Sequence, residues 1–144
     1  MFHLVIMVTN VKMRRLFHCV YTLTYHLVLV TKYRRKCVTR PMLEMLQDIV
    51  AQRCKDWGGE LLDFNGEADH VHILMSLPPN LDLSRFVNNV KTTSSRLVRR
   101  EFGNQLRRVY RKPTFWSRSY CIISCGGAPL SVIKQYVEQQ SAPE

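Results

Sequence analysis

The order in which strand-like and helix-like hydrophobic patterns alternate along the chain constrains the fold more than any other sequence feature. In chain order the patterns predict a strand at 19–32, a helix at 41–57, strands at 60–65 and 70–77, a helix at 83–102, a strand at 119–124 and a helix at 129–140. This β-α-β-β-α-β order predicts an α+β fold of the ferredoxin-like (RRM-like) type. We expect a four-stranded antiparallel sheet with helices on one face, plus a C-terminal helix.

Turn and capping residues fall at the boundaries of these segments. Pro41 suits the first turn of the first helix, and Gly58-Gly59 follows its last turn. Asp82 suits the N-cap of the second helix. Gly103 is expected to end that helix, before an irregular basic stretch over 103–116.

Length and charge indicate a small basic domain. The 144 residues suit one domain, with residues 13–144 as the body and residues 1–12 as an N-terminal extension of unclear role. The 21 Lys and Arg outnumber the 11 Asp and Glu, which gives a formal net charge of +10. A polyanion such as nucleic acid is the expected partner, and a merely soluble basic protein is the alternative.

The five cysteines form no CxxC pair and sit mostly in apolar segments, which favours reduced core thiols over a zinc or disulfide framework. Residues 1–8 are apolar but too short to span a bilayer. We therefore expect a cytoplasmic protein with no membrane partner.

His70-Val71-His72 is the first candidate for chemistry. In a strand, alternate side chains share a face, so Val71, Ile73 and Met75 would point to the helices. His70 and His72 would point the other way and could share one metal ion. Two polar residues on a half-exposed strand are the simpler alternative, and for an isolated HxH pattern that alternative is the commoner one.

Tyr136 and Gln140 lie four residues apart on the predicted last helix and so share a face. A phenol is a poor nucleophile at neutral pH and needs a nearby cation or base. Two imidazoles and the Gln140 amide oxygen would hold Mg²⁺ or Mn²⁺ with positions left for phosphate oxygens. Taken alone, Tyr136 suits an amphipathic anchor equally well, and Gln140 is nearly uninformative.

A basic, hydroxyl-rich flank follows on the second predicted helix and the stretch after it. Its candidate DNA-binding residues are Lys91, Ser94, Ser95, Arg96, Arg99, Arg100, Arg107, Arg108, Arg111 and Lys112. Interleaved aromatics (Tyr110, Phe115, Trp116) would suit stacking on single-stranded or hairpin DNA. The alternative is a solvated helix face whose aromatics cap the core.

Five motifs together resemble those of a known family. They are HCVYTLTYHLVLVTKYRRK (18–36), ADHVHILMSLPP (68–79), Lys91 with Ser94-Ser95-Arg96, FWSRSYC (115–121) and IKQYVEQQ (133–140). In these the chain resembles the small single-tyrosine HUH transposases, the IS200-like TnpA proteins of insertion sequences. Arg118 stands where that pattern commonly has proline, and residues 1–12 lie outside it.

The resemblance implies a role for each matching residue. His70, His72 and Gln140 would be ligands of Mg²⁺ or Mn²⁺, and Tyr136 would form a 5′-phosphotyrosine link while releasing a 3′ hydroxyl. Such enzymes act on single-stranded DNA near hairpins and need no nucleotide cofactor. They typically work as homodimers with composite active sites, so we expect a cytoplasmic prokaryotic enzyme that is nucleoid-associated when acting.

The expected function is therefore DNA transposition by metal-dependent cleavage and rejoining of single strands. One alternative is a domesticated relative that cuts or binds palindromic repeats without mobilising an element. A more distant alternative is a non-catalytic nucleic-acid-binding module, for which the histidines would have no metal role.

Overall fold

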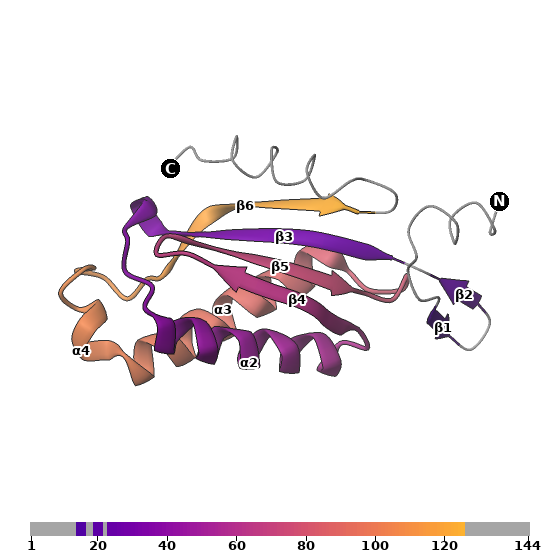
Figure 1. The fold of residues 1–144 in the computed structure, drawn as a ribbon, viewed down its shortest axis with the longest axis horizontal. Helices are drawn as coiled ribbons and strands as arrows, with labels where there is room; N and C mark the ends of the chain where they lie inside the picture. The colour runs from indigo at the N-terminus through magenta and orange to yellow at the C-terminus, as the bar shows by residue number, and fades with distance from the viewer. Residues whose placement is uncertain (1–13, 17–18, 22, 126–144) are drawn as a thin grey trace.

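A computed structural model describes residues 14–16, 19–21 and 23–125 (Figure 1). The predicted extension at 1–12 and the predicted helix at 129–140, with Tyr136 and Gln140, lie outside these described residues. Short strands β1 (Arg14–Leu16) and β2 (Cys19–Tyr21) pair antiparallel with each other as a separate two-stranded sheet.

The predicted four-stranded antiparallel sheet is confirmed within the described residues, with strand order β4-β5-β3-β6. Its strands are β3 (Thr24–Thr31), β4 (Glu60–Gly66), β5 (His70–Ser76) and β6 (Trp116–Ser124). The prediction of one strand over 19–32 was wrong, because this run divides into β2 and β3. The two parts have different partners, β1 and β5, and β-propensity does not show where a run changes partner.

Helices α2 (Arg40–Asp56) and α3 (Leu83–Glu101) lie side by side on one face of the sheet (Figure 1). The hydroxyl of Thr39 accepts a hydrogen bond from the Met42 amide at the start of α2. At the other end of α2, Gly58 adopts a φ of +85°, a conformation that favours glycine. The predicted cap at Asp82 is confirmed, since its carboxylate accepts from the Arg85 amide at 3.2 Å.

The stretch after α3 is more ordered than predicted. Helix α3 ends at Glu101, and a short helix α4 (Gly103–Leu106) follows directly, so Gly103 begins a helical turn instead of opening an irregular segment. The apolar side chain of Leu106 explains the difference, because it is 4% exposed and packs into the core. The short 3-10 turn η1 (Lys32–Arg34) follows β3, at the same end of the molecule as α4 (Figure 1).

The two faces of β5 divide as the strand period predicted. Val71, Ile73 and Met75 are at most 1% exposed and pack in the core between the sheet and the helices. The face away from α2 and α3 carries a small apolar cluster on its β3–β6 half, where Val28 and Cys121 are buried.

Among the described residues, no helix has both the length and the apolar character needed to cross a membrane. The four cysteines whose side chains are described are all free thiols, as predicted.

Candidate metal and nucleic-acid site

His70 and His72 project from the same face of β5, opposite the face that enters the core. Their ring centroids are 4.8 Å apart, with the ring planes nearly perpendicular. Both side chains are half-buried, and they lie opposite Val30 and Val28 of β3 in the strand register. The structure thus brings the two predicted ligands together.

Asp69 fixes the orientation of His70. One carboxylate oxygen of Asp69 lies 2.7 Å from Nδ1 of His70, and the other accepts a hydrogen bond from Arg34 at 2.9 Å. The Asp69 backbone carbonyl accepts from the Thr31 amide, which fixes the turn to the end of β3. With Nδ1 bound to a carboxylate, the Nε2 atom of His70 is the one left to bind a ligand.

The pKa of Asp69 is lowered as a net result of opposing effects. Burial pushes it upward, but hydrogen bonds from His70 and Arg34, together with their charges, outweigh that effect. Asp69 therefore remains a carboxylate at neutral pH, the form that best accepts a hydrogen bond from an imidazole N–H.

A third histidine, His26 of β3, supports His72. Nε2 of His26 lies 3.3 Å from Nδ1 of His72, and the His26 residue is only 6% exposed. Burial lowers the pKa of His26, against the smaller opposing charge of Asp63, so its neutral form is favoured. A neutral His26 shares one hydrogen bond with Nδ1 of His72, and this contact ties the two rings together across β3 and β5.

Glu67 adds a carboxylate to this group. Its Oε2 lies 3.7 Å from Nε2 of His70, and the ligand atoms of Glu67, Asp69 and His70 lie within 4.8 Å of one another. Imidazole nitrogens with a carboxylate oxygen can bind Mn²⁺ and, more weakly, Mg²⁺. The residues present thus fit a divalent ion, and Gln140, the third predicted ligand, lies outside the described residues.

Sequence reasoning missed His26, Asp69, Glu67 and Arg34. Asp69 and Glu67 were placed in a turn, where acidic residues are common for reasons of backbone geometry. Arg34 reaches Asp69 from 35 residues away, a contact that no local pattern shows. His26 shares the strand parity of Val28 and Val30, and this parity was the one signal that places it on the histidine face.

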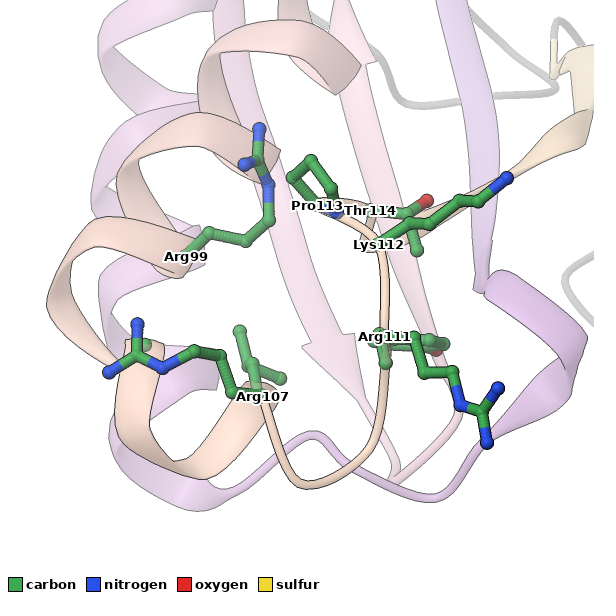
Figure 2. A pocket seen from close by; sticks show the side chains of 9 residues that line it. Arg99, Arg107, Arg111, Lys112, Pro113 and Thr114 are labelled. Carbon is green, nitrogen blue, oxygen red and sulfur yellow. The ribbon is translucent and has the colours of Figure 1, made fainter.

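Four of the predicted DNA-binding cations line one hollow of about 240 Å³ beside α4. Figure 2 shows them spread around it, with Arg99 coming from α3 and Arg111 and Lys112 from the following loop. Arg107 lies at the end of α4, and apolar walls come from Leu106, Tyr110 and Pro113. Arg96, Arg100 and Arg108 are exposed nearby in sequence.

The remaining predicted contacts differ in accessibility. Ser94 is fully buried, donates to the Val90 carbonyl and accepts from the indole N–H of Trp116 at 2.9 Å, so it joins α3 to β6. Ser95 accepts from Arg99, and Lys91 donates to the Arg118 carbonyl. Ser94 is not available to DNA in this fold.

The sequence leaves two alternatives open for the interleaved aromatics, base stacking or capping of the core, and their burial agrees with the second. Tyr110, Phe115 and Trp116 are all at most 7% exposed. Phe115 and Trp116 pack edge to face in the core, and Tyr110 donates to the Lys32 carbonyl at 2.7 Å. Phe115 and Trp116 therefore anchor the end of the loop after α4 in the core, and Tyr110 anchors η1.

A family model described as "Transposase IS200 like" matches residues 19–140, most of the chain. The chain belongs to the IS200-like transposase family. The predicted family is thereby confirmed. Membership of this family implies an enzyme of DNA recombination that cuts and transfers DNA strands.

Two curated relatives agree with this assignment. The transposase is 29% identical over 127 residues to the transposase for insertion sequence element IS200 of Salmonella typhimurium strain LT2, covering 88% of this chain and 82% of the relative. It is 30% identical over 125 residues to the ISDra2 transposase TnpA of Deinococcus radiodurans, covering 87% and 89%.

Two solved structures have similar folds. A crystal structure of a protein assigned as a transposase from Deinococcus radiodurans R1 gives a TM-score of 0.77 at 30% identity, covering 90% of this transposase and 99% of that chain. A REP-associated tyrosine transposase bound to a REP hairpin gives a TM-score of 0.51 at 15% identity, covering 89% and 68%. At that identity the second similarity concerns the fold alone.

Proposed function

We propose that this IS200-like transposase cuts and rejoins single-stranded DNA at hairpin-marked element ends, with Tyr136 as nucleophile beside a divalent ion. The family assignment supports the reaction class. The adjacent imidazoles of His70 and His72, with Nδ1 of His70 held by Asp69 and the Glu67 carboxylate nearby, are the observation that carries the metal role. Hairpin DNA is a partner of the fold-similar REP-associated transposase, and we propose the same class of partner here.

His70, through its Nε2 atom, and His72 would hold the ion, with Gln140 as the third protein ligand. Glu67 is close enough to His70 to supply a carboxylate oxygen as well. When bound, Mg²⁺ or Mn²⁺ would polarise the scissile phosphodiester and neutralise its developing charge. Asp69 and His26 would set the tautomers of the two ligand histidines.

In the proposed reaction the Tyr136 oxygen bonds to phosphorus as the bond from phosphorus to the 3′ oxygen breaks. The phenolic proton is lost, the departing oxygen gains a proton to become a 3′ hydroxyl, and Tyr136 carries the 5′ phosphate. A 3′ hydroxyl from another end reverses these changes and frees Tyr136. The number of phosphoester bonds is conserved, so no nucleotide cofactor is required.

Cations of α3, of α4 and of the loop after it would hold the DNA backbone. We assign this role to the exposed Arg96, Arg100 and Arg108 and to the cations of the hollow, namely Arg99, Arg107, Arg111 and Lys112. Contacts of this kind position the strand without reading its sequence, and they weaken as salt rises. Lys91 and Ser95 are partly exposed and can join them, whereas Ser94 is excluded by its burial.

We further propose that residues 13–144 form the catalytic domain and that the active enzyme is a homodimer with composite sites. The Tyr136 helix of one protomer would complete the histidine site of its partner. Mixing a Tyr136→Phe chain with a His70→Ala chain tests this arrangement, because only composite sites restore cleavage in the mixture.

The direct test uses single-stranded DNA from the flanks of the gene, incubated with the transposase and Mg²⁺ or Mn²⁺. We expect a denaturant-resistant protein–DNA adduct that is lost with EDTA, with Tyr136→Phe and with His70→Ala. Tyr120→Phe serves as a matched control and should still form the adduct. An adduct that persists in Tyr136→Phe would overturn the proposed nucleophile, and hairpin binding without any adduct would favour a binding module.

A further inference from the structure

The turn η1 holds two consecutive residues in a backbone conformation that non-glycine residues rarely adopt. Tyr33 has a φ of 58° and Arg34 a φ of 53°, and they are the non-glycine residues with positive φ in the described part of the chain. Asparagine or glycine would fit this region with less strain than a bulky aromatic. Strain of this kind persists where surrounding contacts impose it and is frequent at functional sites.

Contacts on three sides impose this conformation. The Lys32 carbonyl accepts from the hydroxyl of the buried Tyr110 at 2.7 Å, and the Thr31 hydroxyl donates to the Arg35 carbonyl at 2.7 Å. Arg34 turns inward to Asp69 at 2.9 Å. The left-handed pair thus sends Arg34 toward the histidine site and leaves Tyr33 on the outside of the turn.

The Tyr33 side chain is largely exposed, so packing in the core does not account for an aromatic residue at this position. Its side chain is 56% exposed, and Leu62 at 41% is the other large hydrophobic side chain with comparable exposure among the described residues. The Lys32 ammonium lies 5.3 Å from the centre of the Tyr33 ring, and Arg35 and Lys36 are exposed next to it. An exposed aromatic face among cations is the arrangement that holds single-stranded DNA, by base stacking and phosphate contacts.

Tyr33 directly precedes the residue that links η1 to the histidine site. Its neighbour Arg34 contacts Asp69, and Asp69 contacts Nδ1 of His70 at 2.7 Å. In the sheet register Val30 pairs with His70, three residues before Tyr33. Tyr33 is therefore adjacent in the chain to Arg34, whose side chain is linked to His70 through Asp69.

We propose that Tyr33 is a stacking platform for one base of the single-stranded DNA substrate, close to the scissile phosphate. Arg35 and Lys36 contact the flanking phosphates. This inference rests on the proposed function, since it assumes that single-stranded DNA is bound at the histidine site. The strain at Tyr33 then reflects a requirement for the ring itself, which a residue better suited to the backbone would not meet.

Tyr33→Asn separates this role from a structural one. Asparagine tolerates positive φ better than tyrosine, so the variant should unfold at the same temperature as the wild type or higher. Its affinity for single-stranded DNA from the gene's flanks, measured by fluorescence anisotropy in EDTA, should fall about tenfold. Tyr33→Phe should bind as the wild type does, and Leu62→Asn is the matched control for loss of an exposed apolar side chain.

An abasic scan of the same DNA gives the sharper result. In the wild type, removal of one particular base should weaken binding about tenfold, and in Tyr33→Asn removal of that base should have little further effect. An equal penalty in both proteins would overturn the stacking role even if the wild type forms its Tyr136 adduct. A wild type that binds no single-stranded DNA would instead overturn the proposed function as well.

Discussion

The two faces of β5 carry different kinds of order. On the core face, Val71, Ile73 and Met75 are buried among many apolar neighbours from the sheet and both helices. On the other face, the Asp69 carboxylate holds the ring of His70 and in turn accepts a hydrogen bond from Arg34. The core face contributes stability through many small contacts, whereas the histidine face contributes orientation through a few specific ones.

Ile73→Ala tests the core face and should have the largest effect on stability. Ile73 is fully buried, so the truncation leaves a cavity and should lower the free energy of unfolding by about 2–5 kcal/mol. Urea unfolding followed by circular dichroism measures this loss. Ile123→Ala, a partly buried isoleucine of the small cluster on the opposite face, should cost clearly less, and equal losses would contradict the division.

Asp69→Asn tests the histidine face. The amide keeps the shape of Asp69 but no longer offers a charged acceptor to His70, so Mn²⁺ affinity should fall about 10–100-fold. Calorimetric titration with Mn²⁺ gives the affinity, with Asp48→Asn on the exposed side of α2 as the control. If Asp69→Asn binds Mn²⁺ as tightly as Asp48→Asn does, Asp69 does not orient the ligand.

Tyr110 is a buried residue that also makes one specific hydrogen bond, and Tyr110→Phe should reduce stability less than Ile73→Ala does. The change removes the hydrogen bond to the Lys32 carbonyl that anchors η1, at a cost of about 1 kcal/mol. Unfolding in urea measures the loss, and Tyr33→Phe on the exposed side of the same turn should be neutral. A neutral Tyr110→Phe would mean that η1 is held by its other contacts.

The salt dependence of DNA affinity should depend on the cations of the basic hollow and not on the residues of β5. Replacing Arg107 by Gln removes one cation of the hollow and should reduce the slope of DNA affinity against salt by about one phosphate contact. Anisotropy measured across a range of NaCl concentrations gives the slope. Gln52→Ala, an exposed change on α2, is the control, and an unchanged slope in Arg107→Gln would place the DNA elsewhere.

The sequence predicted what depends on local periodicity. Strand parity placed Ile73 in the core and His70 with His72 on the other face, and the short polar side chain of Asp82 marked the start of α3. These features follow from residues within a few positions of one another, where the physics of strands and caps acts.

Contacts between distant segments could not be predicted in the same way. Arg34 and Asp69 are 35 residues apart, and either one alone is an ordinary loop residue. For Tyr110 the sequence leaves both base stacking and core capping open, because composition cannot distinguish a buried aromatic from an exposed one. The exposure of Tyr33 depends on a strained turn, and two of the contacts that maintain this turn, from Tyr110 to Lys32 and from Arg34 to Asp69, come from distant parts of the chain.

The central claim is that His70 and His72 form one divalent-metal site, and Mn²⁺ titration of the wild type, His70→Ala and His72→Ala tests it most directly. We predict one Mn²⁺ per chain in the wild type, with binding lost in both variants while their unfolding transitions remain cooperative. Mn²⁺ binding that is unchanged in either variant would contradict the claim and would require another role for the histidine pair.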